Sequence, residues 1–321
     1  MNRFILYTLF FVSPFLILII GIEVLLRNQP NIYKEKAGYL DQEAQNIQVI
    51  ILGSSHGITG IDPDAFSKNA YNTANYAQTL DYDYAILDKY QDKLSSLEYI
   101  IVPLSYHILW TRLEYHPQIW RSKYYSIYYR ITKDHNPFKN LLFMDEPIGT
   151  DIETIWNYYY NKDNNIEEDL TSKGLNNLRP EADLDVLESK SHKIIGAHHA
   201  PDLAFMYDQN MQDLKGIIEI AKKKNAKVIF VTLPVYKTFR ELMHPKQLEL
   251  LYKTGNQLQD GKYVFYFNML DVLDPELKDG KNEVFFDSDH LSRKGAEIVG
   301  HKLDSIIQTI EKNEKSANLP N

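Results

Sequence analysis

The sequence feature that most constrains the fold is a short apolar run that ends abruptly in small residues, Val-Ile-Ile-Leu-Gly-Ser-Ser-His-Gly at 49–57. Four consecutive aliphatic residues are typical of a buried strand in a parallel sheet. Gly53 and Gly57 give the backbone freedom to turn, so Ser55 is expected at the carboxyl edge of the sheet, where open α/β folds bind ligands. Ser55 is therefore a candidate nucleophile. On this stretch alone, an ordinary strand-to-loop exit with two serines is an equal alternative.

A second motif lies near the other end of the chain, where Asp287 precedes His290 by three residues. An Asp at this spacing can fold back within one tight turn, so that its carboxylate holds one ring nitrogen while the other faces a nucleophile. We therefore expect Asp287 to orient His290, and His290 to act as the base for Ser55. Asp289 is the second candidate for the orienting role, although its neighbouring position makes it less able to share the face of His290. The alternative is a buried core histidine beside a helix-capping aspartate.

The segments between the two motifs alternate in the manner of an α/β fold. After the first strand, further strands are predicted at 70–74, 99–102, 228–232 and 264–267, with helical spacing of apolar residues between them. This alternation predicts a parallel five-stranded sheet. The last helix carries one apolar stripe and begins after Ser292, which can cap it.

Together the two motifs resemble the SGNH (GDSL-like) hydrolase and acyltransferase superfamily, which has Gly-x-Ser after the first strand and Asp-x-x-His before the last helix. Here these are Gly53-Ser54-Ser55 and Asp287-Ser288-Asp289-His290, and the resemblance covers roughly 47–310. It implies an SGNH or flavodoxin-like sheet with helices on both faces, and a Ser-His-Asp mechanism.

The donors for an oxyanion depart from the superfamily's pattern. The superfamily usually adds a Gly after the second strand and an Asn from a Gly-x-Asn-Asp stretch after the third, and this second stretch is missing here. The replacements we consider, besides the backbone N–H of Ser55, are Asn75, the backbone amide of Ala77, and Ser105. An Asx turn is an equal alternative for Asn75.

The amino-terminal segment has the properties of a membrane anchor. Residues 4–22 carry no charge and are about long enough to cross a bilayer as a helix, and no small-x-small cleavage pattern follows them. We expect an uncleaved transmembrane anchor at 1–27, with a cleaved signal peptide or a buried helix as the alternatives. A polar linker at 28–46, the α/β domain at 47–312 and a polar tail at 313–321 are expected to follow. Basic residues flank the apolar run on both sides, so the resemblance, more than the charge pattern, implies that the domain lies outside the cytoplasmic membrane.

Residues 106–200 interrupt the alternation and are rich in aromatic side chains. All three tryptophans, Trp110, Trp120 and Trp156, fall in this range. We interpret the range as an insertion or lid, with the tryptophans as candidates for binding a sugar, because exposed aromatic patches commonly mark binding surfaces. The alternative is that these rings form the core of the insertion.

Composition excludes several other kinds of protein. A net charge of −8 without a basic stripe argues against nucleic acid as a partner, and the absence of cysteine excludes a thiolate metal site and a Cys nucleophile. The patch formed by His192, His198, His199 and Asp202 is expected to be a solvated loop, since adjacent histidines point in divergent directions. We therefore expect no metal and no cofactor.

The function favoured at this stage is transfer of an acyl group, with acetyl preferred, to or from an extracytoplasmic glycan. The resemblance and the anchor, not the motif spacing, suggest this substrate. The anchor and the short Gly-Ser-Ser stretch are similar to the family that completes D-alanylation of teichoic acids and to alginate-acetylating proteins, which implies a multi-spanning membrane acyltransferase as a possible partner. The alternatives are a plain membrane-anchored esterase or lipase, and a non-catalytic glycan-binding or scaffold protein.

Overall fold

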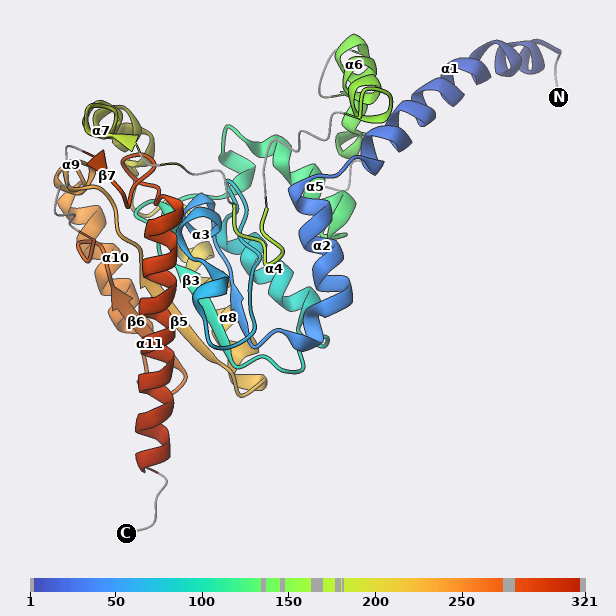
Figure 1. Cartoon of the computed structure of the whole chain (residues 1–321). Helices are drawn as coiled ribbons and strands as arrows, with labels where there is room; N and C mark the ends of the chain where they lie inside the picture. Colours follow the sequence, from blue (N-terminus) through green and yellow to red (C-terminus); the bar gives the residue numbers. More distant parts are fainter. Residues whose placement is uncertain are drawn as a thin grey trace. The chain divides into compact units, whose positions relative to one another are not determined.

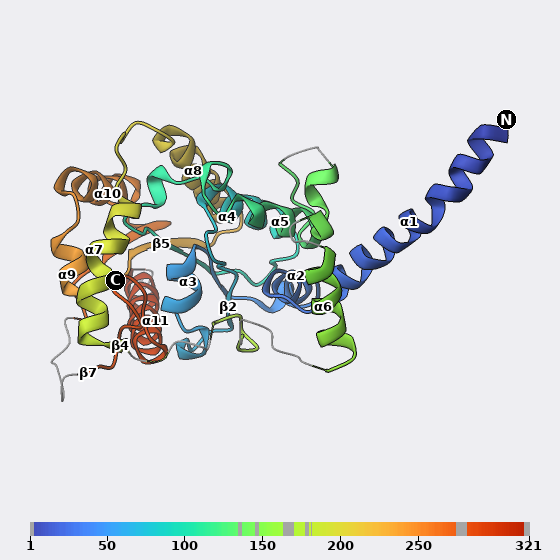
Figure 2. The ribbon, with the colours of Figure 1, turned by 90° about the horizontal axis from the view of Figure 1, so that it is seen from above.

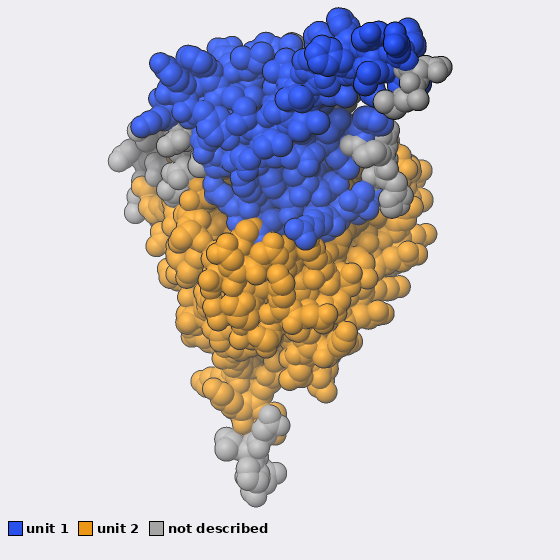
Figure 3. Space-filling view, turned by 90° about the vertical axis from the view of Figure 1, so that its right-hand side faces the viewer, with its two compact units in different colours: residues 1–37, 120–168 blue, residues 38–119, 169–321 orange. Residues whose placement is uncertain are grey.

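The chain divides into two compact units, which are described one at a time. The computed structural model describes residues 3–133, 137–144, 148–162, 170–176, 180, 182–273 and 281–317. Unit 1 comprises 1–37 with 120–168, and unit 2 comprises 38–119 with 169–321 (Figure 3). The predicted insertion at 106–200 is therefore shared between the two units. Of the predicted tail, residues 318–321 lie outside the described part of the chain.

Unit 2 is built on a five-stranded parallel sheet with strand order β2-β1-β3-β5-β6, which confirms the predicted α/β fold (Figure 1). β1 lies between β2 and β3 and pairs with both, with Ile50 opposite Tyr71 and Ile100. Both faces of the sheet are covered, which explains the continuous apolar runs. The strands are β1 (Val49–Ile51), β2 (Ala70–Asn72), β3 (Tyr99–Pro103), β5 (Lys227–Thr232) and β6 (Val264–Asn268).

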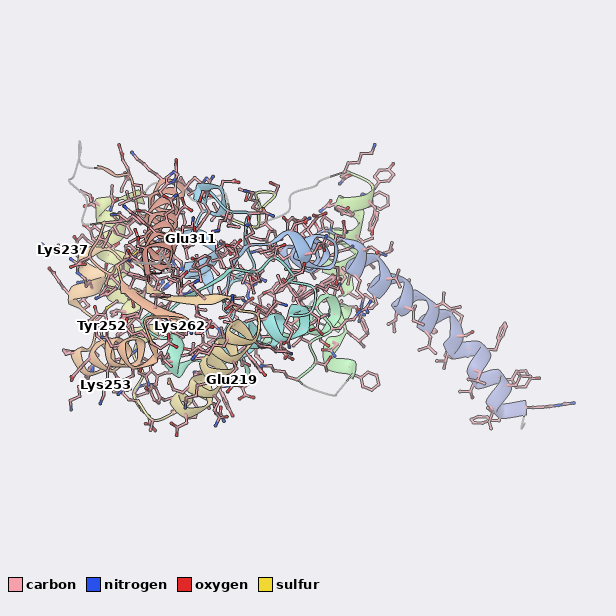
Figure 4. All side chains as sticks on the ribbon, turned by 90° about the horizontal axis from the view of Figure 1, so that it is seen from below. Glu219, Lys237, Tyr252, Lys253, Lys262 and Glu311 are labelled. Carbon is pink, nitrogen blue, oxygen red and sulfur yellow. The ribbon has the colours of Figure 1, made fainter. Side chains whose placement is uncertain are left out.

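Helices cover the sheet from two sides. α11 (Arg293–Ala317) packs Val299, Leu303 and Ile307 against strand residues that include Val49 and Ile51. α4 (Leu80–Tyr90) and α8 (Tyr207–Lys223) lie on the other side (Figure 2). Seen from below, α10 (Pro245–Leu258), which carries Tyr252 and Lys253, and α11, which carries Glu311, lie on opposite sides of the strands (Figure 4).

Shorter elements complete unit 2. As predicted, Ser292 caps α11, because its hydroxyl accepts a hydrogen bond from the Gly295 N–H at 3.2 Å. α11 continues to Ala317, so residues 313–317 of the predicted polar tail are helical. The remaining elements that bear on the site are α3 (Ser55–Gly60), α7 (Leu184–His198), α9 (Lys237–Glu241) and the antiparallel pair β4 (Ala182–Asp183) and β7 (Lys281–Asn282).

Unit 1 is organised around the long apolar helix α1 (Arg3–Asn28), which is long and apolar enough to cross a membrane. Near its end, the Glu23 carboxylate accepts hydrogen bonds from the backbone N–H groups of Leu142 at 2.8 Å and Phe143 at 3.1 Å. These bonds fix η7 (Leu142–Met144) to the last turns of α1. The other elements of this unit are α5 (Ser122–Tyr128), η6 (Pro137–Asn140) and α6 (Ile148–Tyr159).

Much of the predicted polar linker at 28–46 is in fact a helix, α2 (Ile32–Glu43). The side chain of Asn31 caps it by accepting hydrogen bonds from the N–H groups of Tyr33 and Lys34. Tyr33, Ala37 and Leu40 are buried at helical spacing, so the packing of this face stabilises the helix despite its polar composition. The prediction of a linker was wrong because charged residues between these positions conceal the pattern.

The close approach of α11 to the preceding loop makes a testable prediction. A Cβ atom at Gly295 would lie 2.2 Å from the carbonyl oxygen of Val284, whereas one at Gly38 in α2 would meet nothing within 4 Å. We expect Gly295→Ala to destabilise the protein by about 1–3 kcal/mol, because backbone must move. Gly38→Ala should be neutral or stabilise by about 0.5 kcal/mol. Thermal unfolding of both variants beside the wild type measures this, and equal melting temperatures would contradict it.

Candidate active site

The turn after β1 is held by glycine geometry and by two hydrogen bonds. Gly53 has a φ of +117°, and a Cβ there would lie 3.1 Å from the Pro103 ring, so glycine suits this position on both counts. Its N–H donates to Asp83 Oδ1 at 2.8 Å, and its carbonyl accepts from the Asn75 N–H at 3.1 Å. The chain then enters α3, whose first residue is Ser55.

The loop before α11 brings the second motif into shape. Asp287 Oδ1 accepts hydrogen bonds from the backbone N–H groups of Asp289 at 3.1 Å and His290 at 2.8 Å. The N–H of Phe286 donates to the carbonyl of His290 at 3.0 Å, which closes the turn. This tight turn is the local reason that an Asp three residues before a His can reach its ring.

The structure brings Ser55, His290 and Asp287 into one hydrogen-bonded line. His290 Nε2 lies 2.8 Å from Ser55 Oγ. On the other side of the ring, His290 Nδ1 lies 2.9 Å from Asp287 Oδ1 and 3.1 Å from Oδ2. A hydroxyl, an imidazole and a carboxylate in this order can transfer a proton from the hydroxyl to the ring while the carboxylate fixes the tautomer.

Asp289 also reaches the His290 ring, although the sequence made it only the second candidate. Its Oδ1 lies 3.3 Å from His290 Nδ1, and its Oδ2 lies 3.2 Å from His56 Nε2 and 3.8 Å from His198 Nδ1. Asp287 makes the shorter contact with the His290 ring. The Asp289 carboxylate therefore lies near three imidazoles, whereas the Asp287 carboxylate contacts only that of His290 among these rings.

The two carboxylates strongly affect the protonation of His290. Burial by itself lowers the pKa of His290, but the charges of Asp289 and Asp287 and their hydrogen bonds outweigh burial and raise the pKa to about 10. Burial likewise raises the pKa of Asp289, but His290 and His56 outweigh it and hold that pKa well below its ordinary value. The site therefore favours an imidazolium between two carboxylates at neutral pH.

Sequence reasoning missed a cluster of histidines beside this line. The ring centroid of His56 lies 4.9 Å from that of His290 and 5.5 Å from that of His107, and the His107 and His198 centroids are 4.2 Å apart. Burial is the main cause that lowers the pKa of His198 to about 4 and that of His107 well below its ordinary value. His198 ends helix α7 and packs into this cluster, so the expectation of a solvated loop was wrong there. Only the fold brings these separate segments together.

The same cluster is where a metal would be sought. Ligand atoms of His56, Asp289 and His290 all lie within 4.8 Å of one another. Both nitrogens of His290, however, already contact Ser55 and Asp287. A metal held there would compete with those contacts, and the arrangement is accounted for by hydrogen bonds between the side chains themselves.

The three oxyanion candidates lie in loops that follow β2 and β3. Asn75 is fully buried, and neither atom of its side-chain amide has a hydrogen-bond partner within the described part of the chain. Ser105 is buried as well, and its hydroxyl also has none among those residues. Ala77 adopts a left-handed conformation with a φ of +53°. Leaving a buried amide unpaired costs about 1–3 kcal/mol, so a ligand atom bonded to the Asn75 amide would relieve this cost. Their roles stay predictions.

The three tryptophans have different surroundings. Trp110 is buried in unit 2, where its indole N–H donates to the Leu203 carbonyl at 2.8 Å. This ring therefore serves packing and presents no open face to a sugar. Trp120 and Trp156 belong to unit 1 and are 44% and 54% exposed. Sugar binding at these two residues stays a prediction.

Asp83 is a second group that the sequence did not reveal. Its side chain is fully buried, and Oδ1 accepts hydrogen bonds from the Gly53 N–H at 2.8 Å and from Gln78 Nε2 at 2.6 Å. Burial raises the pKa of Asp83 to about 7 against these bonds, which lower it. Asp83 thus holds the turn that carries Ser55, and its charge varies near neutral pH.

Comparisons with known proteins give only remote structural likenesses. No protein-family model matches the chain, and no curated protein matches it. Among solved structures, one described as "a putative platelet activating factor from Streptococcus pneumonia" is 11% identical, with a TM-score of 0.41, covering 88% of this chain and 94% of that one. Another, "a putative acylhydrolase" from Bacteroides fragilis, is 13% identical, with a TM-score of 0.40, covering 86% and 95%. These likenesses leave the function to be argued from the site itself.

The position of Asp289 predicts a change in pH dependence. A histidine acts as a base only when neutral, so activity is lost as the pH falls through its pKa. Asp289→Asn removes one of two neighbouring negative charges and should lower the pKa of His290, moving the acid limb of the kcat/KM profile to lower pH by roughly one unit or more. Hydrolysis of a small activated ester across pH measures the limb. An unmoved limb would show that the Asp289 charge has little influence on His290.

Asp83 predicts a pH-dependent stability. Its pKa in the folded protein, about 7, lies above the ordinary value of 3.8, so folding favours the protonated form. The stability that Asp83 contributes is present below pH 3.8 and is lost as the pH rises through about 7. Asp83→Asn keeps an acceptor for Gly53 but cannot ionise. Urea unfolding at pH 5 and pH 8 should show a smaller loss of stability for this variant than for the wild type, and an equal loss would contradict the assignment.

Proposed function

We propose that the protein is a serine-dependent acyl hydrolase or acyltransferase in which Ser55 is the nucleophile, His290 the base and Asp287 the orienting carboxylate. The observation that carries this proposal is the double contact of one imidazole, with Nε2 2.8 Å from Ser55 Oγ and Nδ1 2.9 Å from Asp287 Oδ1. This arrangement of side chains performs acyl transfer on several unrelated folds, so it supports the chemistry through geometry and not through sequence position.

The mechanism follows from these contacts. Ser55 Oγ attacks the carbonyl carbon of an ester while its proton passes to His290 Nε2, and Asp287 stabilises the resulting imidazolium. The negative oxygen of the tetrahedral intermediate is received by donors near the turn, for which the Ser55 N–H and the Asn75 amide are our candidates. The intermediate collapses as His290 returns the proton to the leaving alcohol, which leaves an acyl-serine. Water or an acceptor hydroxyl, deprotonated by His290, then removes the acyl group.

The high proton affinity of His290 sets a condition on this cycle. With a pKa raised to about 10, His290 is mostly protonated at neutral pH and must lose that proton before Ser55 can be activated. Once the base has accepted the serine proton, the same two carboxylates stabilise the imidazolium that forms. The two carboxylates therefore lower the fraction of neutral, active His290, and they stabilise the imidazolium that forms during the reaction.

The acceptor and the location belong to the proposal as well. We propose that α1 spans a membrane, supported by its length and its exposed apolar surface. From the resemblance, we propose an extracytoplasmic glycan as acceptor, acetyl as the group carried, and a multi-spanning membrane acyltransferase as donor partner. Release of the acyl group to water in the presence of glycan would instead favour a plain esterase.

The experiment that tests the proposal replaces Ser55 and His290, one at a time and then together. Ser55→Ala and His290→Ala should each reduce ester turnover by at least about 10³-fold, and the double variant should be little worse than either one, because the residues act as a unit. A fluorophosphonate probe should label the wild type but not Ser55→Ala.

The adjacent serine provides a matched control. Ser54 precedes Ser55 and its hydroxyl is buried. Ser54→Ala should keep both probe labelling and turnover near the wild-type level. Losses that multiply in the double variant, or a greater loss at Ser54 than at Ser55, would refute the assignment, and a folded wild type that resists the probe would favour a non-catalytic protein.

A further inference from the structure

Helix α6 in unit 1 carries a row of exposed apolar and aromatic side chains along one face. The four residues of the row are 43–54% exposed, and their spacing of four, four and three residues places them on the same side of a helix. The next residue after the helix, Tyr160, is 69% exposed and stacks on Trp156 with ring centroids 4.3 Å apart. The four residues on the helix itself are Ile148, Ile152, Trp156 and Tyr159, and we call them the α6 row.

The rest of α6 is polar or turned inward. Thr150, Glu153 and Thr154 are exposed on the side away from the row, and Asp151 is buried. The helix contains no lysine or arginine. A surface that binds the α6 row must therefore attract it through apolar and aromatic contact and not through negative charge.

Hydrogen bonds within unit 1 attach α6 and the two short helices before it, η6 and η7, to the end of α1, at the point where the apolar run gives way to charged residues. The Tyr159 hydroxyl donates to the Leu25 carbonyl at 3.2 Å, and Arg27 donates to the Asn140 carbonyl at 3.0 Å. Glu23, the first charged residue after the apolar run, receives the N–H groups at the start of η7. Figure 1 shows α6 beside this end of α1. The row is thus fixed at the level where a spanning α1 would leave the hydrocarbon core.

The chemistry of the row suits that level of a bilayer. Tryptophan and tyrosine concentrate at membrane–water interfaces because each joins an apolar ring to a polar tip. A helix with one apolar face and one polar face lies in the plane of the interface, with its apolar side chains buried about 5–10 Å below the headgroups. The α6 row has this composition and is attached beside the span.

We propose that α6 lies in the membrane interface, with the α6 row in contact with lipid at the boundary between headgroups and acyl chains. This inference rests on the proposal that α1 spans the membrane. It assigns Trp156 to lipid in place of the sugar contact expected from the sequence. The rigid attachment of α6 to α1 then gives unit 1 two points of contact with one leaflet and fixes its rotation about α1.

The absence of cysteine allows a direct test with the full chain. Ile152→Cys in the row, Thr154→Cys on the opposite side of α6 and Ile17→Cys in α1 each receive a nitroxide label in vesicles of phosphatidylcholine with no other protein. All three native side chains are exposed, so the labels should be tolerated. Collision with oxygen, which concentrates in lipid, is compared with collision with a water-soluble nickel complex.

The expected result is a ratio of oxygen to nickel collisions several-fold higher at 152 than at 154, with 17 also on the lipid side. A water-exposed label at 152 with a lipid-exposed label at 17 would overturn the interfacial assignment while leaving the span in place, and would favour a protein partner for the row. A water-exposed label at 17 would refute the span and, with it, the interfacial role. Neither outcome bears on Ser55 and His290, which the ester assay tests separately.

Discussion

The candidate site depends on the parallel pairing of β1 with strands on both sides. Because parallel strands end at the same edge of a sheet, the turn that holds Ser55, the loop that holds Asn75 after β2 and the loop that holds Ser105 after β3 all leave the sheet together. Only three residues of β1 are paired, so the register of Ile50 with Tyr71 and Ile100 fixes the start of every one of these loops. A shift of one residue would turn all the side chains of β1 to the opposite face of the sheet.

The two aspartates beside His290 are bound differently and so contribute different properties. Asp287 also accepts two backbone N–H groups, so its carboxylate is held by the loop itself and sets the position of the ring. The contacts of the Asp289 carboxylate are instead with side chains, because it lies near three imidazoles, those of His56, His198 and His290. Its influence is mainly on proton affinity. Orientation and basicity of one histidine are therefore set by separate residues.

The sequence predicts what depends on local pattern and misses what depends on long-range packing. The five strands follow from runs of apolar residues, and the contact of Ser55 with His290 and Asp287 follows from motif spacing joined to the rule that loops share an edge. The histidine cluster could not be predicted, because His56, His107 and His198 come from three segments whose approach depends on the loops. The sequence left open whether Trp110 binds a sugar or packs in a core, since aromatic composition does not distinguish a packed ring from an exposed one. Helix α2, by contrast, left a local signal in its Asn31 cap.

Strand β6 is an edge strand of the five-stranded sheet, and an edge strand can pair with a strand of another chain. Among the residues that the structure describes, no further strand pairs with its outer backbone groups, and its sequence Val-Phe-Tyr-Phe-Asn favours β structure. Before it, Asp260 Oδ1 accepts hydrogen bonds from the N–H groups of Lys262, Tyr263 and Val264, and these bonds form a turn from which the strand begins. Charged side chains at that end and a length of five residues restrict pairing with another chain. Self-association through this edge is thus limited by the same turn that begins the strand.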